Sequence, residues 1–70
     1  MVYFVIETQV EAGIGSVVPF SFTDRDQAEA KYHSLLAVAA LSEVDKHGVL
    51  LANEDGFVLK SEVYNHTVAE

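Results

Sequence analysis

The chain has 70 residues and no cysteine, and its eleven Asp and Glu against four Lys and Arg give a formal net charge of −7. The absence of cysteine excludes disulfides and thiolate metal sites. Proteins that bind nucleic acids or anionic membranes neutralise phosphate groups with Lys and Arg, so this composition argues against both classes. We therefore expect no direct nucleic-acid partner and no membrane partner.

The length is suited to a single domain, 1–70, close to the lower limit for a core that folds alone. Such a core seldom contributes more than about 3–5 kcal/mol without a disulfide, a metal or oligomerisation. Half of the residues are hydrophobic, which is a high share for so small a body. Both facts favour a homo-oligomer, a dimer or larger, and the alternative is a marginally stable monomer.

Two features bear on location. No apolar run approaches the length of a membrane span. The first residues, MVYFVIE, lack the basic segment and cleavage site of a signal peptide. We therefore expect the protein to be cytoplasmic in the cell that makes it.

The first hairpin is predicted from β-branched and aromatic residues around a glycine-containing turn. Val2–Val10 is the first expected strand, Glu11–Ser16 the turn and Val17–Phe22 the returning strand. Pro19 cannot donate to a ladder, so the second strand is expected at a sheet edge or with a bulge. Alternation along the first strand places Val2, Phe4, Ile6 and Thr8 on one face and Tyr3, Val5, Glu7 and Gln9 on the other.

Residues 23–41 carry the only sustained helical period. Thr23 is expected to cap the helix, with Asp26 completing a weak capping box. One apolar face, at helical spacing, consists of Ala28, Tyr32, Leu35, Leu36 and Ala39. A second stripe, which the chain's own sheet cannot also cover and which we expect to be the oligomer interface, consists of Ala30, Ser34, Ala37, Val38 and Leu41.

A second hairpin follows the connector Ser42–Gly48. Its strands are expected at His47–Ala52 and Phe57–Val68, joined by a turn at Asn53–Gly56 that suits a left-handed glycine. In the last strand, alternation groups Phe57, Leu59 and Val63 on one face and Val58, Lys60, Glu62, Tyr64 and His66 on the other.

The element order predicts an α+β fold, ββαββ, with a four-stranded, mainly antiparallel sheet and one helix, about residues 24–41, packed on one face. The face away from the helix is then expected to carry charged residues around a weaker contact surface made of Tyr3, Val5, Val58 and Tyr64.

The sequence contains no motif typical of a metal, catalytic or cofactor site. His33 and Glu29 are four residues apart on the helix, but they have no compact set of further ligands, so we interpret them as a solvated stripe and expect no metal. No serine stands in a nucleophile elbow, and the glycines of EAGIGS are followed by a strand and lack the phosphate-loop lysine. We expect no cofactor, no catalytic residue and no enzymatic activity.

One polar and aromatic set is a candidate binding site. A pocket for an anionic ligand between subunits would form if the last strand faced a neighbouring subunit's helix. The alternative is that the tyrosine on the helix is a core side chain and the others are simply exposed. The set consists of Tyr32, His33, Lys60, Tyr64 and His66.

The segments AEAKYHSLLAVAALS (28–42), HGVLL, EDG and KSEVYNH together resemble short open reading frames of phages and mobile elements of gut and Gram-positive bacteria. No activity is established for that group. The resemblance implies a small accessory phage protein, with structural, regulatory or anti-defence roles. The acidic charge suits an inhibitor docking on a basic host protein, and the alternative is that it serves only solubility.

Two functional hypotheses follow from different classes. The first is a small acidic, non-enzymatic interaction protein that forms a homo-oligomer and binds another protein. The alternative is a protein that binds or sequesters an anionic small molecule at a subunit interface. Basic residues gathered beside tyrosines in a pocket would favour the ligand, and scattered basic residues would favour the protein partner.

Overall fold

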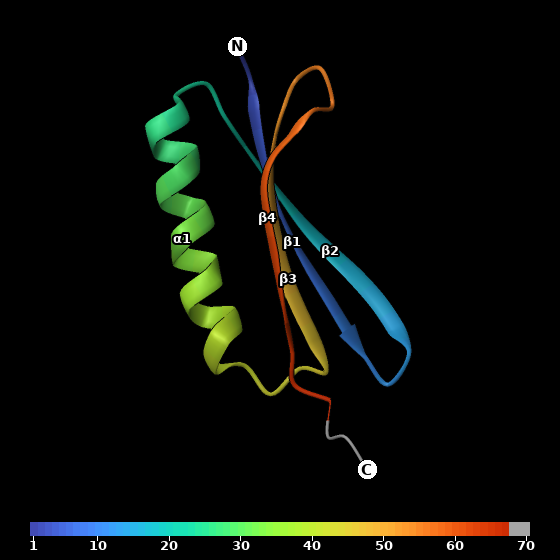
Figure 1. Cartoon of the computed structure of the whole chain (residues 1–70). Coiled ribbons are helices and arrows are strands. Elements are labelled where there is room, and N and C mark those ends of the chain that lie inside the picture. Colours follow the sequence, from blue (N-terminus) through green and yellow to red (C-terminus); the bar gives the residue numbers. More distant parts are fainter. Residues whose placement is uncertain (68–70) are drawn as a thin grey trace.

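The four strands form one antiparallel sheet in the order β2-β1-β3-β4, and the helix lies against one of its two faces (Figure 1). The computed structural model describes residues 1–67. Its elements are β1 (Tyr3–Glu11), β2 (Ile14–Phe22), α1 (Arg25–Leu41), β3 (Lys46–Asn53) and β4 (Val58–Asn65). This confirms the α+β class and the ββαββ order. The predicted end of the last strand, Val68, lies outside the described residues.

The first hairpin closes more tightly than the predicted turn. Ala12 and Gly13 both have positive φ, 53° and 79°, as the two central residues of a type I′ turn require. This turn has the twist of the flanking strands, so pairing continues to Glu11 and Ile14. Gly15 therefore belongs to β2, and Pro19 lies in an edge strand as expected.

The N-cap of the helix lies one residue later than predicted. Asp24, not Thr23, is the N-cap, with extended φ and ψ of −113° and 122°. Its carboxylate accepts a 2.9 Å hydrogen bond from the backbone N–H of Asp26. The predicted capping box is therefore wrong, because Asp26 contributes its backbone N–H to the cap and its position is only two residues after the capping residue.

The predicted apolar face of the helix is confirmed. The buried helix residues are Ala28, Tyr32, Leu35, Leu36 and Ala39. They form the core with Val5 of β1 and with Val49 and Leu51 of β3, the two central strands. The helix is thus centred over the middle of the sheet.

The expected facing of β1 is inverted. Val5 is 0% exposed and contacts the helix core, whereas Phe4 is 37% exposed on the opposite side. Tyr3 and Tyr64, expected on the open side, also pack against the core. Alternation shows which residues share a face but not which face is covered. A carboxylate such as that of Glu7 is unfavourable inside a core unless it is paired. Here it is paired, with His47.

A β-bulge breaks the predicted alternation in β4. Leu51 is opposite Lys60 and Ala52 is opposite Val58, so Leu59 is an extra residue in the edge strand. Leu59 packs against the core, while Val63 is 61% exposed on the other face. The two therefore do not share a face, contrary to the prediction.

Candidate interaction surface

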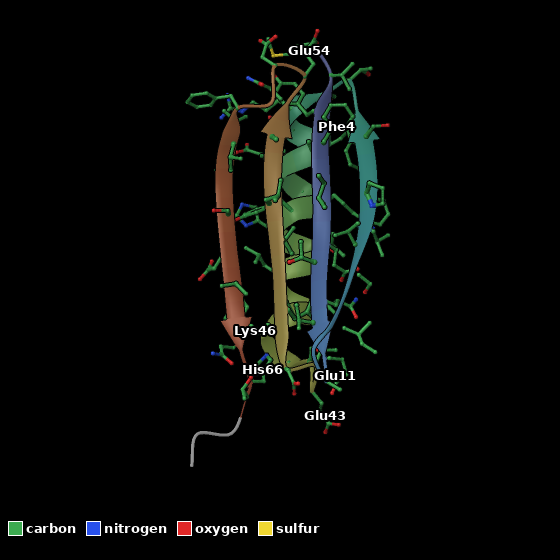
Figure 2. All side chains as sticks on the ribbon, turned by 90° about the vertical axis from the view of Figure 1, so that its right-hand side faces the viewer. Phe4, Glu11, Glu43, Lys46, Glu54 and His66 are labelled. Atoms are coloured by element: carbon green, nitrogen blue, oxygen red, sulfur yellow. The ribbon has the colours of Figure 1, made fainter. Side chains whose placement is uncertain are left out.

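One face of the sheet has no helix over it. Figure 2 looks onto this face, and α1 lies behind the strands. We call it the open face. Its two central strands contribute Phe4, Ile6, Thr8 and Val10 from β1, opposite Ala52, Leu50, Gly48 and Lys46 from β3.

The edge strands extend the open face on both sides. Cross-strand pairing with β1 and β3 determines which of their residues belong to it, because paired residues share a face. β2 contributes Ser21, Pro19, Val17 and Gly15, and β4 contributes Val58, Ser61, Val63 and Asn65. Val17, Val58 and Val63 are all exposed there.

The open face is free of carboxylates within residues 1–67. The acidic residues of the strands, Glu7, Glu11 and Glu62, alternate onto the side that faces the helix. Other acidic residues lie in the helix and in the connections at the two ends of the sheet. Figure 2 shows Glu54 at one end and Glu43 at the other, well away from the middle of the face. A net charge of −7 is therefore distributed around an uncharged centre.

A shallow hollow interrupts the open face at Gly48. Thr8, Leu50, Ser61 and Val63 lie around it. A Cβ at Gly48 would lie 3.0 Å from the backbone oxygen of Glu62 and 3.0 Å from Oγ1 of Thr8, closer than ordinary van der Waals contact. Glycine therefore lets β1, β3 and β4 pack closely here and leaves a depression on the surface.

The predicted oligomer stripe on the helix is exposed along its whole length. The residues concerned are Ala30, Ser34, Ala37, Val38 and Leu41. Leu41, at the end of the helix, is 88% exposed. The chain's own sheet does not cover this stripe, as expected, but most of its members are small and present little apolar area.

The candidate ligand residues lie along the seam between α1 and β4 of the same chain. Tyr32 is buried, and its ring meets that of the exposed His33 edge to face, with centroids 5.4 Å apart. Lys60 Nζ lies 2.8 Å from Glu29 Oε1. Tyr64 stacks on His66, whose Nε2 is 2.8 Å from the carbonyl oxygen of Ala39. The strand thus faces its own helix, and these contacts close the seam.

The pKa shifts of two residues along this seam reflect their contacts and burial. Hydrogen bonding to Lys60, together with its charge, lowers the pKa of Glu29 below its ordinary value of 4.5. Burial raises the pKa of Tyr32, and the nearby Glu62 charge adds to this effect. At the opposite seam, Lys31 Nζ lies 4.3 Å from the centre of the Phe20 ring. Three of the four basic side chains of the chain therefore lie on separate elements: Lys31 on α1, Lys46 on β3 and Lys60 on β4.

Sequence reasoning missed a buried polar pair. Nε2 of His47 lies 2.7 Å from Oε2 of Glu7, and the His47 residue is only 3% exposed. Within residues 1–67, no group forms a hydrogen bond with Nδ1 of His47. The signal for this pair was the alternation of His47 with Val49 and Leu51, which places the imidazole on the core face of β3.

Comparison with protein families, with curated proteins and with solved structures found no match to this chain. Among the described residues, no helix has the length and apolar character needed to cross a membrane. Nor do residues 1–67 contain three or more His, Asp or Glu side chains grouped as metal ligands.

Proposed function

We propose that this chain is a non-enzymatic interaction protein that binds another protein surface through its open face. The observation that carries the proposal is an apolar sheet face that spans all four strands and that, within residues 1–67, has no helix over it and bears no carboxylate. Sheets in soluble proteins usually cover one face and expose polar side chains on the other. Large exposed apolar patches are typical of interaction sites.

The buried pair of Glu7 and His47 supports a structural role over a catalytic one. A carboxylate that orients an imidazole is a common catalytic arrangement. Here the imidazole is 3% exposed, and neither it nor Glu7 lines the hollow at Gly48. A substrate in that hollow therefore has no contact with either group.

The contacts along the α1–β4 seam favour a protein partner over a small anionic ligand. An anionic ligand needs basic groups that converge and are free to bind it. Lys60 is already paired with Glu29, and His66 already contacts the carbonyl of Ala39. The other basic residues are scattered, which is the arrangement expected for the protein-binding hypothesis.

The carboxylates at the ends of the sheet add charge selectivity to the proposed surface. An apolar centre with an acidic perimeter complements a surface with a basic perimeter. The resemblance to phage reading frames supports a host protein as such a partner, in the role of an inhibitor. Binding of that kind weakens as salt is added, because exposed charges are screened.

Site-specific photo-crosslinking in the host cell tests the proposal. A crosslinking amino acid replaces Val63 on the open face in one variant and Leu41 on the helix in the other, and both sites are well exposed. We expect discrete covalent adducts from position 63 and few from position 41. Adducts only from position 41, or none from either position, would overturn the proposal.

A further inference from the structure

We infer that the open face binds a second copy of the chain, with the two sheets stacked face to face and Leu50 of each copy in the Gly48 hollow of the other. The inference rests on the proposed function, because it uses the same open face, and it adds a second copy of the chain as an occupant of that face. Three features carry it: the charge distribution, the area of the face and its relief.

Charge limits how two copies can meet. Each chain has a net charge of −7, so contact between acidic regions of two copies is repulsive. Among the described residues, the open face is the broad surface without carboxylates, and its single charged residue there, Lys46, lies at one end. Stacking through this face keeps the acidic residues at the perimeter, where water and salt screen them.

The area suits a reversible dimer. Strands of eight or nine residues make a face about 27 Å long, and four strands make it about 19 Å wide. That is roughly 500 Å² in projection for each copy, or about 1,000 Å² in total, near the lower limit for specific interfaces. A second copy would also add the apolar burial that so small a core lacks.

The relief of the face is self-complementary. Gly48 and Leu50 are adjacent open-face positions of β3, about 6.6 Å apart. A two-fold axis that crosses the strands between these positions places Leu50 of each copy over Gly48 of the other. The same axis places Ile6 over Thr8 on β1 and Val63 over Ser61 on β4. A larger side chain thus meets a smaller one on these three strands, as interdigitated packing requires.

Sedimentation equilibrium of the purified full-length chain tests for the dimer. We expect a monomer–dimer equilibrium in which Val63→Glu raises the dissociation constant by about tenfold or more, because it buries an unpaired charge. Leu41→Glu adds the same charge on the exposed helix stripe and should change the constant by less than about twofold. Added salt should strengthen the dimer, since it screens repulsion between two acidic copies.

A charge-swap experiment tests the register. Ser61→Glu and Val63→Lys each place a charge on the open face at an exposed position of β4. Because the proposed axis brings these two positions together, an equimolar mixture of the two variants should form a heterodimer more readily than either variant self-associates. Native mass spectrometry separates the three species. An absence of preference for the heterodimer would overturn the proposed register.

A wild-type chain that stays monomeric at millimolar concentration would overturn the inference, as would dissociation by Leu41→Glu but not by Val63→Glu. Neither result would remove the proposed function by itself. If the dimer fails and the proposed function holds, the crosslinking amino acid at position 63 should form adducts with a different protein in the cell, and that contact should weaken with salt. Self-adducts from position 63 would support the dimer, and adducts with a different protein would support the proposed function.

Discussion

The two faces of the sheet are made from alternate residues of the same strands, yet they differ in an unexpected way. Ionisable groups, including Glu7, His47 and Glu62, belong to the face that the helix covers. The open face is almost entirely uncharged. In most half-covered sheets the polar residues are on the uncovered side. The uncovered face of this protein therefore exposes apolar side chains such as Val17, Val58 and Val63 to water.

The width of the helix explains part of the difference. A helix with its side chains is about 10–12 Å across, whereas four strands span about 19 Å. The helix therefore lies mainly over β1 and β3, and Val18 of β2 stays 42% exposed on the covered side. Long polar side chains close the two seams, with Lys31 over Phe20 and with Lys60 on Glu29. The ionisable side chains on the helix-covered side therefore shield the two edges of the core that the helix does not reach.

The largest expected effect is a loss of stability that differs between two neighbouring leucines. Leu51 is 0% exposed beneath the helix, and Leu50 is half-buried on the open face. Leu51→Ala should lower the free energy of unfolding by about 2–5 kcal/mol, because it leaves a cavity in the core. Leu50→Ala should cost about 1–2 kcal/mol in the dilute monomer. Urea unfolding at low protein concentration measures both, and equal losses would mean that the two faces are equally buried.

The next largest expected effect on stability concerns the buried pair of Glu7 and His47 on the covered face. Glu7→Ala leaves the imidazole of His47 buried without an acceptor, which should cost about 1–3 kcal/mol. Glu7→Gln keeps an amide oxygen at the same position and should cost less. Thermal unfolding of both variants at neutral pH provides the measurement. If Glu7→Ala is as stable as the wild type, the pair does not contribute to the core.

Gly48 tests the close packing of the strands beneath the open face. Gly48→Ala places a Cβ 3.0 Å from a backbone oxygen, and overpacking of this kind costs about 1–3 kcal/mol. Gly15→Ala is the matched control, since no heavy atom lies within 4 Å of its added Cβ. We expect Gly15→Ala to be neutral or slightly stabilising. Equal unfolding midpoints for the two variants would contradict the tight contact at Gly48.

The smallest effect concerns the ion pair on the flank of the covered face. Because Lys60 lowers the pKa of Glu29, the pair stabilises the fold above the unfolded-state pKa, and this contribution disappears as the pH falls through the lowered value. Lys60→Met should raise the pKa of Glu29 toward 4.5. A carboxyl titration by NMR measures the shift. An unchanged pKa would show that the pair does not form in solution.

Much of the fold could be predicted from the sequence because local signals agreed with one another. The spacing of Ala28, Tyr32 and Leu35 defined the buried side of the helix, and it matched the structure. Pro19 indicated an edge strand, and Asn53–Gly56 indicated a turn, where Gly56 has φ +80°. Each of these features depends on residues close together in the chain.

The choice of covered face could not be predicted, because it depends on contacts between distant residues. On the core face, the carboxylate of Glu7 contacts His47, which is forty residues away in the chain. The bulge at Leu59 likewise arises from pairing with β3 and leaves no mark in the local pattern. Inverting the faces of β1 also hid the open face, whose apolar character becomes clear only when the four strands are placed side by side.

The most direct test of the account compares solvent access at three methyl-bearing residues by NMR with a soluble paramagnetic agent. Val5 is buried under the helix, Val63 lies on the open face and Leu41 lies on the helix stripe. At high protein concentration we expect Val5 and Val63 to be protected and Leu41 to remain accessible, and dilution should expose Val63 alone. If Val63 is accessible at every concentration while Leu41 becomes protected, the interaction surface is the helix and the account is wrong.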